Sequence, residues 1–212
     1  MGVKNELQDI ISGVGVETGK DLIQAAAYYL RKSQKASRNS EKTKLNNKEQ
    51  ETKELIVWIN RNELWFLTHD ENRFIASGAE QRVYLHQDER FVYKLNDTIF
   101  YQLWKDYFHS LLIHNYFFPR TAYELIGFYQ TEGTLQAVVK QPFIELTEVT
   151  KIESIKAFLT KNGFLEKKNN DYFNTELGLI LEDLHDENVL TNNGILFFID
   201  TIFYLKPSFF RK

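Results

Sequence analysis

Short apolar runs between polar turns predict a β-rich region in the middle of the chain. Short runs of β-branched and aromatic residues are separated by polar turns, a pattern typical of antiparallel strands. The predicted strands are residues 74–76, 83–85, 91–95, 123–128 and 135–141. Short polar connections join the first three strands, so we expect a meander, and the turn sequence at 130–133 predicts a hairpin between the last two.

Helical spacing replaces the strand pattern in other segments. An aromatic-rich segment between the third and fourth strands predicts a long helix, with Asp97 as its N-cap and Pro119 just beyond its end. Residues 151–161 predict a second helix, which Gly163 would end. Near the N-terminus, apolar residues recur at helical spacing within 18–33, which predicts a short amphipathic helix.

A polar, lysine-rich segment separates this N-terminal helix from the rest of the chain. Residues 37–49 carry too little apolar surface to offset the entropy of ordering them, so we interpret them as a charged flexible linker. The chain then divides into a helical extension, residues 1–36, the linker, and a domain formed by residues 50–212. That domain opens with a further helical pattern at residues 55–59.

Composition narrows the class of protein. Of the 212 residues, 43% are hydrophobic and 26% are charged, proportions typical of a globular protein. The net charge of −3 gives no basic field, so we do not expect nucleic acid as a partner. The absence of cysteine excludes disulfides, zinc fingers and thiol catalysis. No apolar run suits a signal peptide or a membrane span, so we expect a cytoplasmic protein without a membrane partner.

Acidic and amide residues near the end of the chain are spaced as phosphoryl transfer requires. Asp183 and Asn188 have four residues between them, and a hairpin with an Asn-Gly turn at 193–194 leads to Asp200. Transfer of phosphate to a hydroxyl needs a carboxylate that accepts the hydroxyl proton, and oxygen ligands for a magnesium ion that neutralises the phosphates. An Asp and an Asn at this spacing also occur by chance in charged loops, and only the strand that delivers Asp200 beside Asn188 makes the combination moderately specific.

A second group of candidates lies in the predicted meander. Lys94 stands in the third strand among apolar residues, and Gly78 lies in the turn between the first two strands. A lysine in such a strand is either an edge residue whose ammonium reaches solvent or a point charge that binds the phosphates of a nucleotide. In the second interpretation, the turn at Gly78 folds over those phosphates.

These segments together resemble the minimal protein-kinase-like domain found in bacterial polyvalent proteins and other proteins of mobile elements. The stretches that carry the resemblance are residues 77–85, 92–95, 114–128, 141–144, 183–190 and 198–200. The resemblance implies that ATP and Mg²⁺ are the cofactors. It also implies that Lys94 pairs with phosphate, that Asp183 is the catalytic base, and that Asn188 and Asp200 bind the metal ion.

The resemblance further implies a nucleotide-binding loop and a hinge. Gly78 would belong to the phosphate loop, and Glu80 in the same loop would pair with Lys94. Gln141 and Phe143 would belong to the hinge, whose backbone binds adenine. The implied fold is α+β and kinase-like: an N-terminal lobe at about 66–141 with a five-stranded antiparallel sheet and one long helix, a truncated C-terminal lobe at about 142–212, and the helical N-terminal extension.

Four features depart from the usual kinase pattern. The phosphate loop has one glycine, and the predicted long helix offers Gln102 and Asp106 where kinases have a Glu that pairs with the lysine. Asp200 is followed by Thr201 and Ile202 where kinases have Phe and Gly. Only twelve residues follow Asp200, fewer than an activation segment and a large helical lobe need.

Three functions therefore remain open. The first is ATP-dependent transfer of the γ-phosphate to a hydroxyl of an unknown protein or small-molecule acceptor. The second is a catalytically weak or inactive pseudokinase, a nucleotide-binding or interaction module that uses its N-terminal helix to recruit a protein partner. The third is nucleotidyl transfer by a kinase-like fold.

Overall fold

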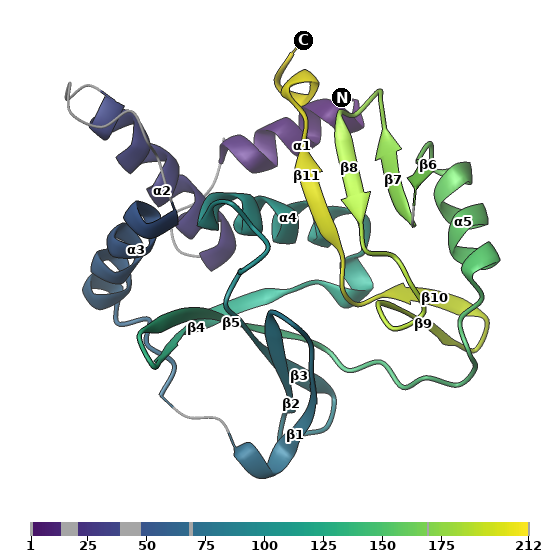
Figure 1. Cartoon of the computed structure of the whole chain (residues 1–212), viewed down its shortest axis with the longest axis horizontal. Helices are drawn as coiled ribbons and strands as arrows, with labels where there is room; N and C mark the ends of the chain where they lie inside the picture. Colours follow the sequence, from purple (N-terminus) through teal and green to yellow (C-terminus); the bar gives the residue numbers. More distant parts are fainter. Residues whose placement is uncertain (1, 14–20, 39–47, 68–69, 169, 212) are drawn as a thin grey trace. The chain divides into compact units, whose positions relative to one another are not determined.

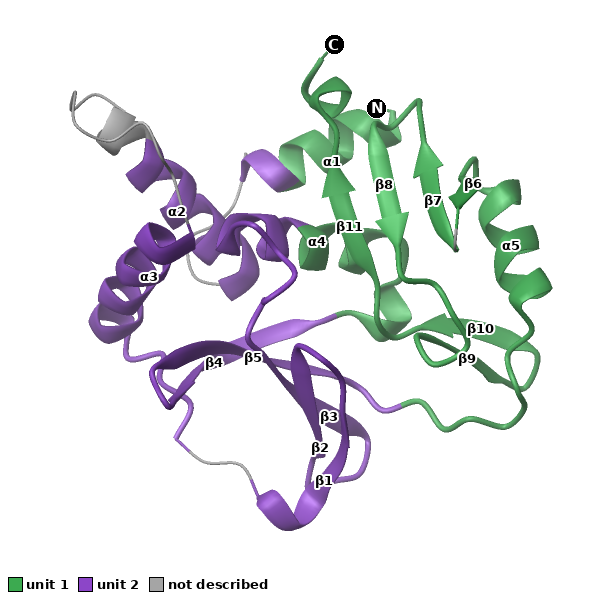
Figure 2. Cartoon of the chain, in the orientation of Figure 1, with its two compact units in different colours: residues 1–10, 110–122, 144–212 green, residues 11–109, 123–143 purple. Residues whose placement is uncertain are grey.

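The computed structural model describes residues 2–13, 21–38, 48–67, 70–168 and 170–211. This part of the chain forms two compact units (Figure 2). Unit 1 comprises residues 1–10, 110–122 and 144–212, and unit 2 comprises residues 11–109 and 123–143. Among the described residues, no helix is both long enough and apolar enough to cross a membrane.

Unit 2 contains a five-stranded antiparallel sheet with the order β1-β2-β3-β5-β4 (Figure 1). Its strands are β1 (Phe74–Ser77), β2 (Gln81–Leu85), β3 (Phe91–Asn96), β4 (Glu124–Thr131) and β5 (Thr134–Pro142). The five predicted strands, the meander and the hairpin are thereby confirmed. The hairpin turns at Glu132 and Gly133, whose φ angles of 49° and 80° suit a two-residue turn that matches the twist of the strands.

The two faces of this sheet differ in character. One face carries an apolar cluster formed by Tyr84, Leu95, Val138 and the partly buried Phe66, Tyr93, Ile126 and Tyr129. Because side chains alternate along a strand, Lys94 and Asn96 lie on the opposite face of β3 from Leu95. Phe128 also lies on that second face, and its ring is 6.3 Å from that of Trp58 and 6.4 Å from that of Trp104.

Helices cover this second face of the sheet. The helix α2 (Leu22–Arg38) packs on α3 (Lys48–Asn62), where the ring of Tyr29 stacks on Trp58 at 5.9 Å. The helical prediction for 18–33 is confirmed from residue 22, whereas residues 18–20 lie outside the described part. The predicted linker is helical at both ends, at residues 37–38 and 48–49, and its middle, residues 39–47, also lies outside the described part.

The helix α4 (Trp104–Phe117) begins later than the sequence suggests. Asp97 does not cap it: the Asp97 carboxylate accepts a hydrogen bond from the backbone N–H of Ile99 at 3.0 Å, and Thr98 has a φ of 59°, so the chain turns here. The helix is capped from α3, because the carboxylate of the buried Glu51 accepts the backbone N–H of Lys105 at 3.1 Å. The prediction that Asp97 caps this helix is therefore wrong. The residue that caps it, Glu51, lies 54 positions before Lys105 in the sequence.

Unit 1 contains a four-stranded antiparallel sheet with the order β11-β8-β7-β6 and a separate two-stranded hairpin. Its elements are α5 (Ile152–Lys161), β6 (Leu165–Lys168), β7 (Asp171–Asn174), β8 (Leu179–Glu182), β9 (Val189–Asn192), β10 (Ile195–Phe198) and β11 (Ile202–Leu205). The predicted helix α5 and the hairpin β9-β10 are confirmed, and Gly163 has the φ of 79° expected after a helix end. The larger sheet was not predicted, because four-residue strands carry too little periodicity to recognise.

The N-terminal helix α1 (Val3–Ser12) begins in unit 1. The ammonium of Lys4 donates to the backbone carbonyl of Ser208 at 3.0 Å, and the hydroxyl of Tyr116 donates to the carboxylate of Glu6 at 2.7 Å. These bonds attach the first residues of the chain to the C-terminal half of α4 and to the end of the chain. The mixed α+β class is confirmed, and the helical pattern expected at residues 55–59 lies within α3. Three helices, α2, α3 and α4, accompany the first sheet.

Candidate functional site

In unit 2, β3 carries the predicted phosphate-binding lysine. Lys94 pairs with Val83 on β2 and with Val139 on β5, so it stands in the interior of the sheet and not at an edge. Its side chain is buried, with 4% of the residue exposed, and the ammonium lies 5.5 Å from the ring centre of Tyr123. An interior, buried lysine argues against a merely solvent-seeking edge residue.

The loop between β1 and β2 carries the other two predicted phosphate-site residues. The backbone N–H of Gly78 donates to the carbonyl of Gln81 at 2.9 Å, which closes the hairpin. A Cβ atom at position 78 would meet only the Gln81 side chain, at 3.9 Å, and Gly78 does not have a left-handed φ. The fold of unit 2 therefore does not itself require a glycine here. The carboxylate of Glu80 accepts a hydrogen bond from Asn96 at 3.2 Å, so the tip of the loop is attached to the end of β3.

The predicted hinge lies at the end of β5. Gln141 is buried and pairs with Val92, while Phe143 is 43% exposed. The backbone N–H of Phe143 donates to the carbonyl of Arg90 at 2.8 Å, which extends the ladder with β3 by one pair. Because successive residues of a strand direct their backbone groups to opposite sides, the carbonyl of Pro142 points away from β3.

In unit 1, the loop that follows β8 gathers two predicted site residues. The amide nitrogen of Asn188 donates to the backbone carbonyl of Asp183 at 2.8 Å and to its carboxylate at 2.9 Å. The same nitrogen lies 3.1 Å from Nε2 of His185, and the buried Leu184 anchors the loop beneath. Asp183 has a φ of 63°, in the left-handed region, and 55% of its side chain is exposed. Burial, followed by the charge of Asp171, raises the pKa of the neighbouring Glu182.

Asp200 is attached to the same loop. Its backbone N–H donates to the carbonyl of Asn188 at 3.2 Å, and the N–H of Ile199 donates to that carbonyl at 2.9 Å. The strands that flank this point, β8 and β11, are paired to each other. The structure therefore brings Asp183, Asn188 and Asp200 together within unit 1.

A buried hydrogen-bonded pair supports the residue that follows Asp200. The hydroxyl of Thr201 lies 2.7 Å from Nδ1 of His114, whose Nε2 lies 2.9 Å from the carbonyl of Thr121. Since a carbonyl can only accept, Nε2 carries a proton and donates to Thr121, and in the neutral ring Nδ1 then accepts from the hydroxyl of Thr201. The hydroxyl of Ser110 also contacts this residue, because it donates to the backbone carbonyl of Thr201 at 3.4 Å. No spacing in the sequence connects positions 87 apart, so sequence reasoning missed the role of His114.

The donor atoms in unit 1 suit a hard cation. The nitrogen of Asn188 is engaged by Asp183, which leaves the amide oxygen as the atom able to bind a metal ion. Carboxylate and amide oxygens are the ligands that Mg²⁺ prefers, and Mg²⁺ usually takes one or two protein groups together with phosphate oxygens. Within the described residues, no group of three or more His, Cys, Asp or Glu side chains could hold a metal ion. The side-chain oxygens of Asn188 and Asp200 are of the type that would bind a magnesium ion.

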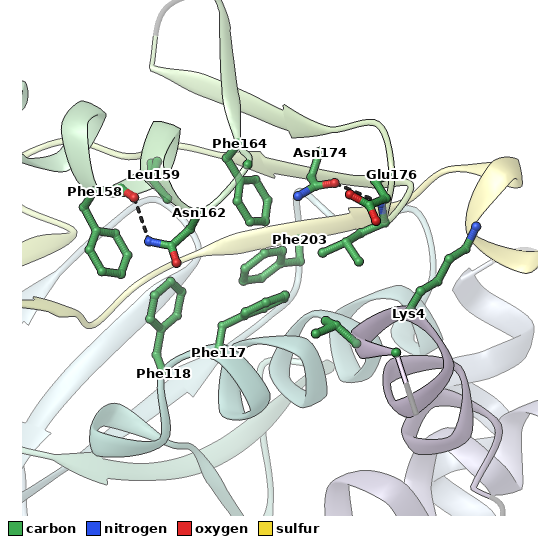
Figure 3. Close-up of a pocket in the computed structure, with 14 residues that line it drawn as sticks. Lys4, Phe117, Phe118, Phe158, Leu159, Asn162, Phe164, Asn174, Glu176 and Phe203 are labelled. Atoms are coloured by element: carbon green, nitrogen blue, oxygen red, sulfur yellow. Dashed lines mark hydrogen bonds between the residues drawn. The ribbon is translucent and has the colours of Figure 1, made fainter.

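Unit 1 also contains an aromatic cavity of about 450 Å³ (Figure 3). Its walls include five phenylalanines, which are Phe117, Phe118, Phe158, Phe164 and Phe203. Asn174 and Glu176 lie at one end of the cavity and Asn162 at the other. None of the predicted site residues lines this cavity.

A comparison with known protein families shows to which family the chain belongs. Residues 48–207 match the family described as serine/threonine/tyrosine kinases found in polyvalent proteins. The chain belongs to this family. The resemblance deduced from the sequence is thereby confirmed.

Membership of the polyvalent-protein kinase family supports a kinase-like phosphotransferase. The matched region begins at the first residue of α3 and includes every predicted site residue, while α1 and α2 lie outside it. Neither the curated proteins nor the solved structures contain a match.

Proposed function

We propose that the protein transfers the γ-phosphate of ATP to a hydroxyl acceptor in the presence of Mg²⁺. The observation that supports this most directly is the assembly of Asp183, Asn188 and Asp200 in unit 1, joined through the carbonyl and the side-chain amide of Asn188. These are the residue types that phosphoryl transfer requires, in a chain that belongs to a kinase family.

Each residue has a distinct role in this proposal. The carboxylate of Asp183 accepts the proton of the acceptor hydroxyl while the hydroxyl oxygen forms a bond to the γ-phosphorus. The bond between that phosphorus and the bridging oxygen of ADP breaks, and ADP leaves. The oxygens of Asn188 and Asp200 hold Mg²⁺, which neutralises charge on the phosphates. The exposure of the Asp183 side chain is consistent with access for an acceptor.

Residues of unit 2 bind the nucleotide in the same proposal. Lys94 contacts the phosphates and is paired with Glu80, while Gly78 allows the loop to approach them closely. Adenine binds at the backbone of 141–143. Because the N–H of Phe143 is engaged by Arg90, we expect the carbonyl of Pro142 to supply the hydrogen bond to adenine.

Phosphate transfer from γ-labelled ATP tests this function in the full chain. We expect label on an acceptor or on the protein itself, with loss of at least about 100-fold on Asp183→Asn, as for removal of a general base. Asp200→Asn and Lys94→Met should lose transfer as well. Asp186→Asn is the matched control, because Asp186 is exposed in the same loop and has no role in the proposal. Transfer that is equal in Asp183→Asn and in wild type would refute the assignment.

One observation favours a second candidate, a module that binds nucleotide without turnover. The N–H of Gly78, which a phosphate loop would direct at its ligand, donates to Gln81. If this candidate is correct, ATP raises the melting temperature of the wild type and not of Lys94→Met, but no transfer depends on Asp183. Transfer of label from α-labelled ATP would identify nucleotidyl transfer instead.

A further inference from the structure

A buried amide ties the tip of the loop between β1 and β2 to the sheet of unit 2. Asn96, which is 4% exposed, donates through Nδ2 to the carboxylate of Glu80 at 3.2 Å. Its Oδ1 accepts the backbone N–H of Thr98 at 2.7 Å. A backbone N–H can only donate and a carboxylate can only accept, so the chemistry of the neighbours determines the orientation of this amide. A side-chain amide satisfies both neighbours at once, since it carries a donor and an acceptor.

A lysine from α3 joins the same group of residues. The ammonium of Lys48 donates to the backbone carbonyl of Thr98. Burial lowers the pKa of Lys48, while the negative charges of Asp97 and Glu80 oppose that shift. Lys48 is thus joined to Glu80 through Thr98 and Asn96, because the backbone of Thr98 accepts from Lys48 and donates to the amide that holds Glu80. Lys48 stands at the start of α3, in a segment that was expected to be a flexible linker.

The residues that hold Glu80 lie close to Lys94, the predicted phosphate-binding lysine. Lys94 and Asn96 are two residues apart on β3, so their side chains lie on the same face, with Cα atoms about 7 Å apart. Asn96 thus holds the carboxylate of Glu80 on the face that carries Lys94. A glutamate at the tip of a short hairpin would otherwise sample several rotamers, and ordering it would oppose nucleotide binding.

We propose that Asn96 and Lys48 are positioning residues of the nucleotide site, which hold the carboxylate of Glu80 where it can orient the Lys94 ammonium toward phosphate. This inference rests on the proposed function. It extends the site to α3, so that the first residue of the family match helps to position Glu80.

The test compares two ligands on the full chain, MgATP and adenosine, by calorimetric titration. Asn96→Asp keeps an acceptor for the N–H of Thr98, removes the donor to Glu80 and places two carboxylates together. Lys48→Met keeps the apolar length of the side chain and removes its charge. The control is Lys53→Met in the same helix, where the lysine is exposed and paired with Glu49.

We expect Asn96→Asp and Lys48→Met each to weaken MgATP binding about tenfold or more, as for loss of a hydrogen bond to a charged group. Adenosine, which has no phosphate, should bind each variant as it binds wild type, and Lys53→Met should bind both ligands normally. Equal weakening of both ligands would indicate a merely structural role and overturn the inference. Unchanged MgATP binding in either variant would also overturn it.

Further variants separate this inference from the function on which it rests. If Lys94→Met abolishes MgATP binding while Asn96→Asp and Lys48→Met do not weaken it, the inference is wrong and the proposed function stands. If wild type itself fails to bind MgATP, both are wrong. Should Asn96→Asp fail to fold, Lys48→Met alone decides, because Lys48 lies at the end of a helix and is only partly buried.

Discussion

The backbone at Asp183 gives a prediction that separates stability from chemistry. Asp183 has a φ of 63°, a conformation that costs a residue with a Cβ atom about 1–2 kcal/mol and costs glycine almost nothing. The backbone is held there because its carbonyl accepts a hydrogen bond from Asn188 and the next residue, Leu184, is fully buried. Replacing Asp183 by Ala or by Gly removes the same carboxylate, but only the Ala variant retains the strain.

The difference between the two variants can be worked out. Relief of strain favours Asp183→Gly by about 1–2 kcal/mol, and the greater freedom of glycine in the unfolded chain opposes it by about 0.4–1 kcal/mol. The midpoints of these two ranges differ by about 0.8 kcal/mol, so the free energy of unfolding of Asp183→Gly should exceed that of Asp183→Ala by about this amount. For a chain of this size, the melting temperatures should differ by about 1–4 °C.

Urea unfolding and γ-phosphate transfer measure the two consequences. Both variants should lose transfer to the same extent, because both lack the carboxylate. The matched pair is Asp186→Ala and Asp186→Gly in the same loop, where φ is not positive and Ala should be at least as stable as Gly. If Asp183→Ala is as stable as Asp183→Gly, the backbone at this position is not held in the left-handed region and the reasoning fails.

Three further predictions concern packing and pH. Burial lowers the pKa of His109 to about 3. Between pH 6.5 and 3 the unfolded chain therefore binds a proton that the folded chain does not. The free energy of unfolding should fall on acidification by up to about 1.4 kcal/mol per pH unit in this range. His109→Gln should reduce that slope in urea unfolding, and equal slopes would contradict the assignment. Gly178→Ala should destabilise by about 3 kcal/mol, because its φ is 72° and a Cβ would lie 2.6 Å from a backbone nitrogen. Gly133→Ala, with a φ of 80° and open space, should cost only about 1 kcal/mol, and thermal unfolding that shows equal losses would refute the packing argument. Thr201→Val should lower the free energy of unfolding by about 1–3 kcal/mol, because Nδ1 of the buried His114 loses its hydrogen-bond partner. Thr201→Ser keeps the hydroxyl and should lower it less. Equal losses for the two variants in urea unfolding would show that this hydrogen bond contributes nothing.

The sequence by itself determined the elements that depend on local pattern. The five strands of the first sheet follow from short runs of β-branched and aromatic residues between polar turns, and the two hairpins follow from turn residues that tolerate positive φ. The order Asp183, Asn188, hairpin, Asp200 also lies within a short stretch of chain, so adjacency of these residues could be inferred from the turn alone. Each of these inferences needs only residues that are close in sequence, whose geometry the backbone constrains directly.

Only the tertiary structure decided the features that depend on distant residues. The start of α4 is set by the carboxylate of Glu51, because a helix N-terminus is stabilised by whichever acceptor reaches its free N–H groups, and propensity near Asp97 could not reveal it. Asp200 is supported by a histidine 87 positions from Thr201, and the loop tip at Glu80 is held by an amide 16 positions away. Burial makes such partners necessary, since a polar group removed from water must be hydrogen-bonded, and the fold as a whole selects which residue meets that need.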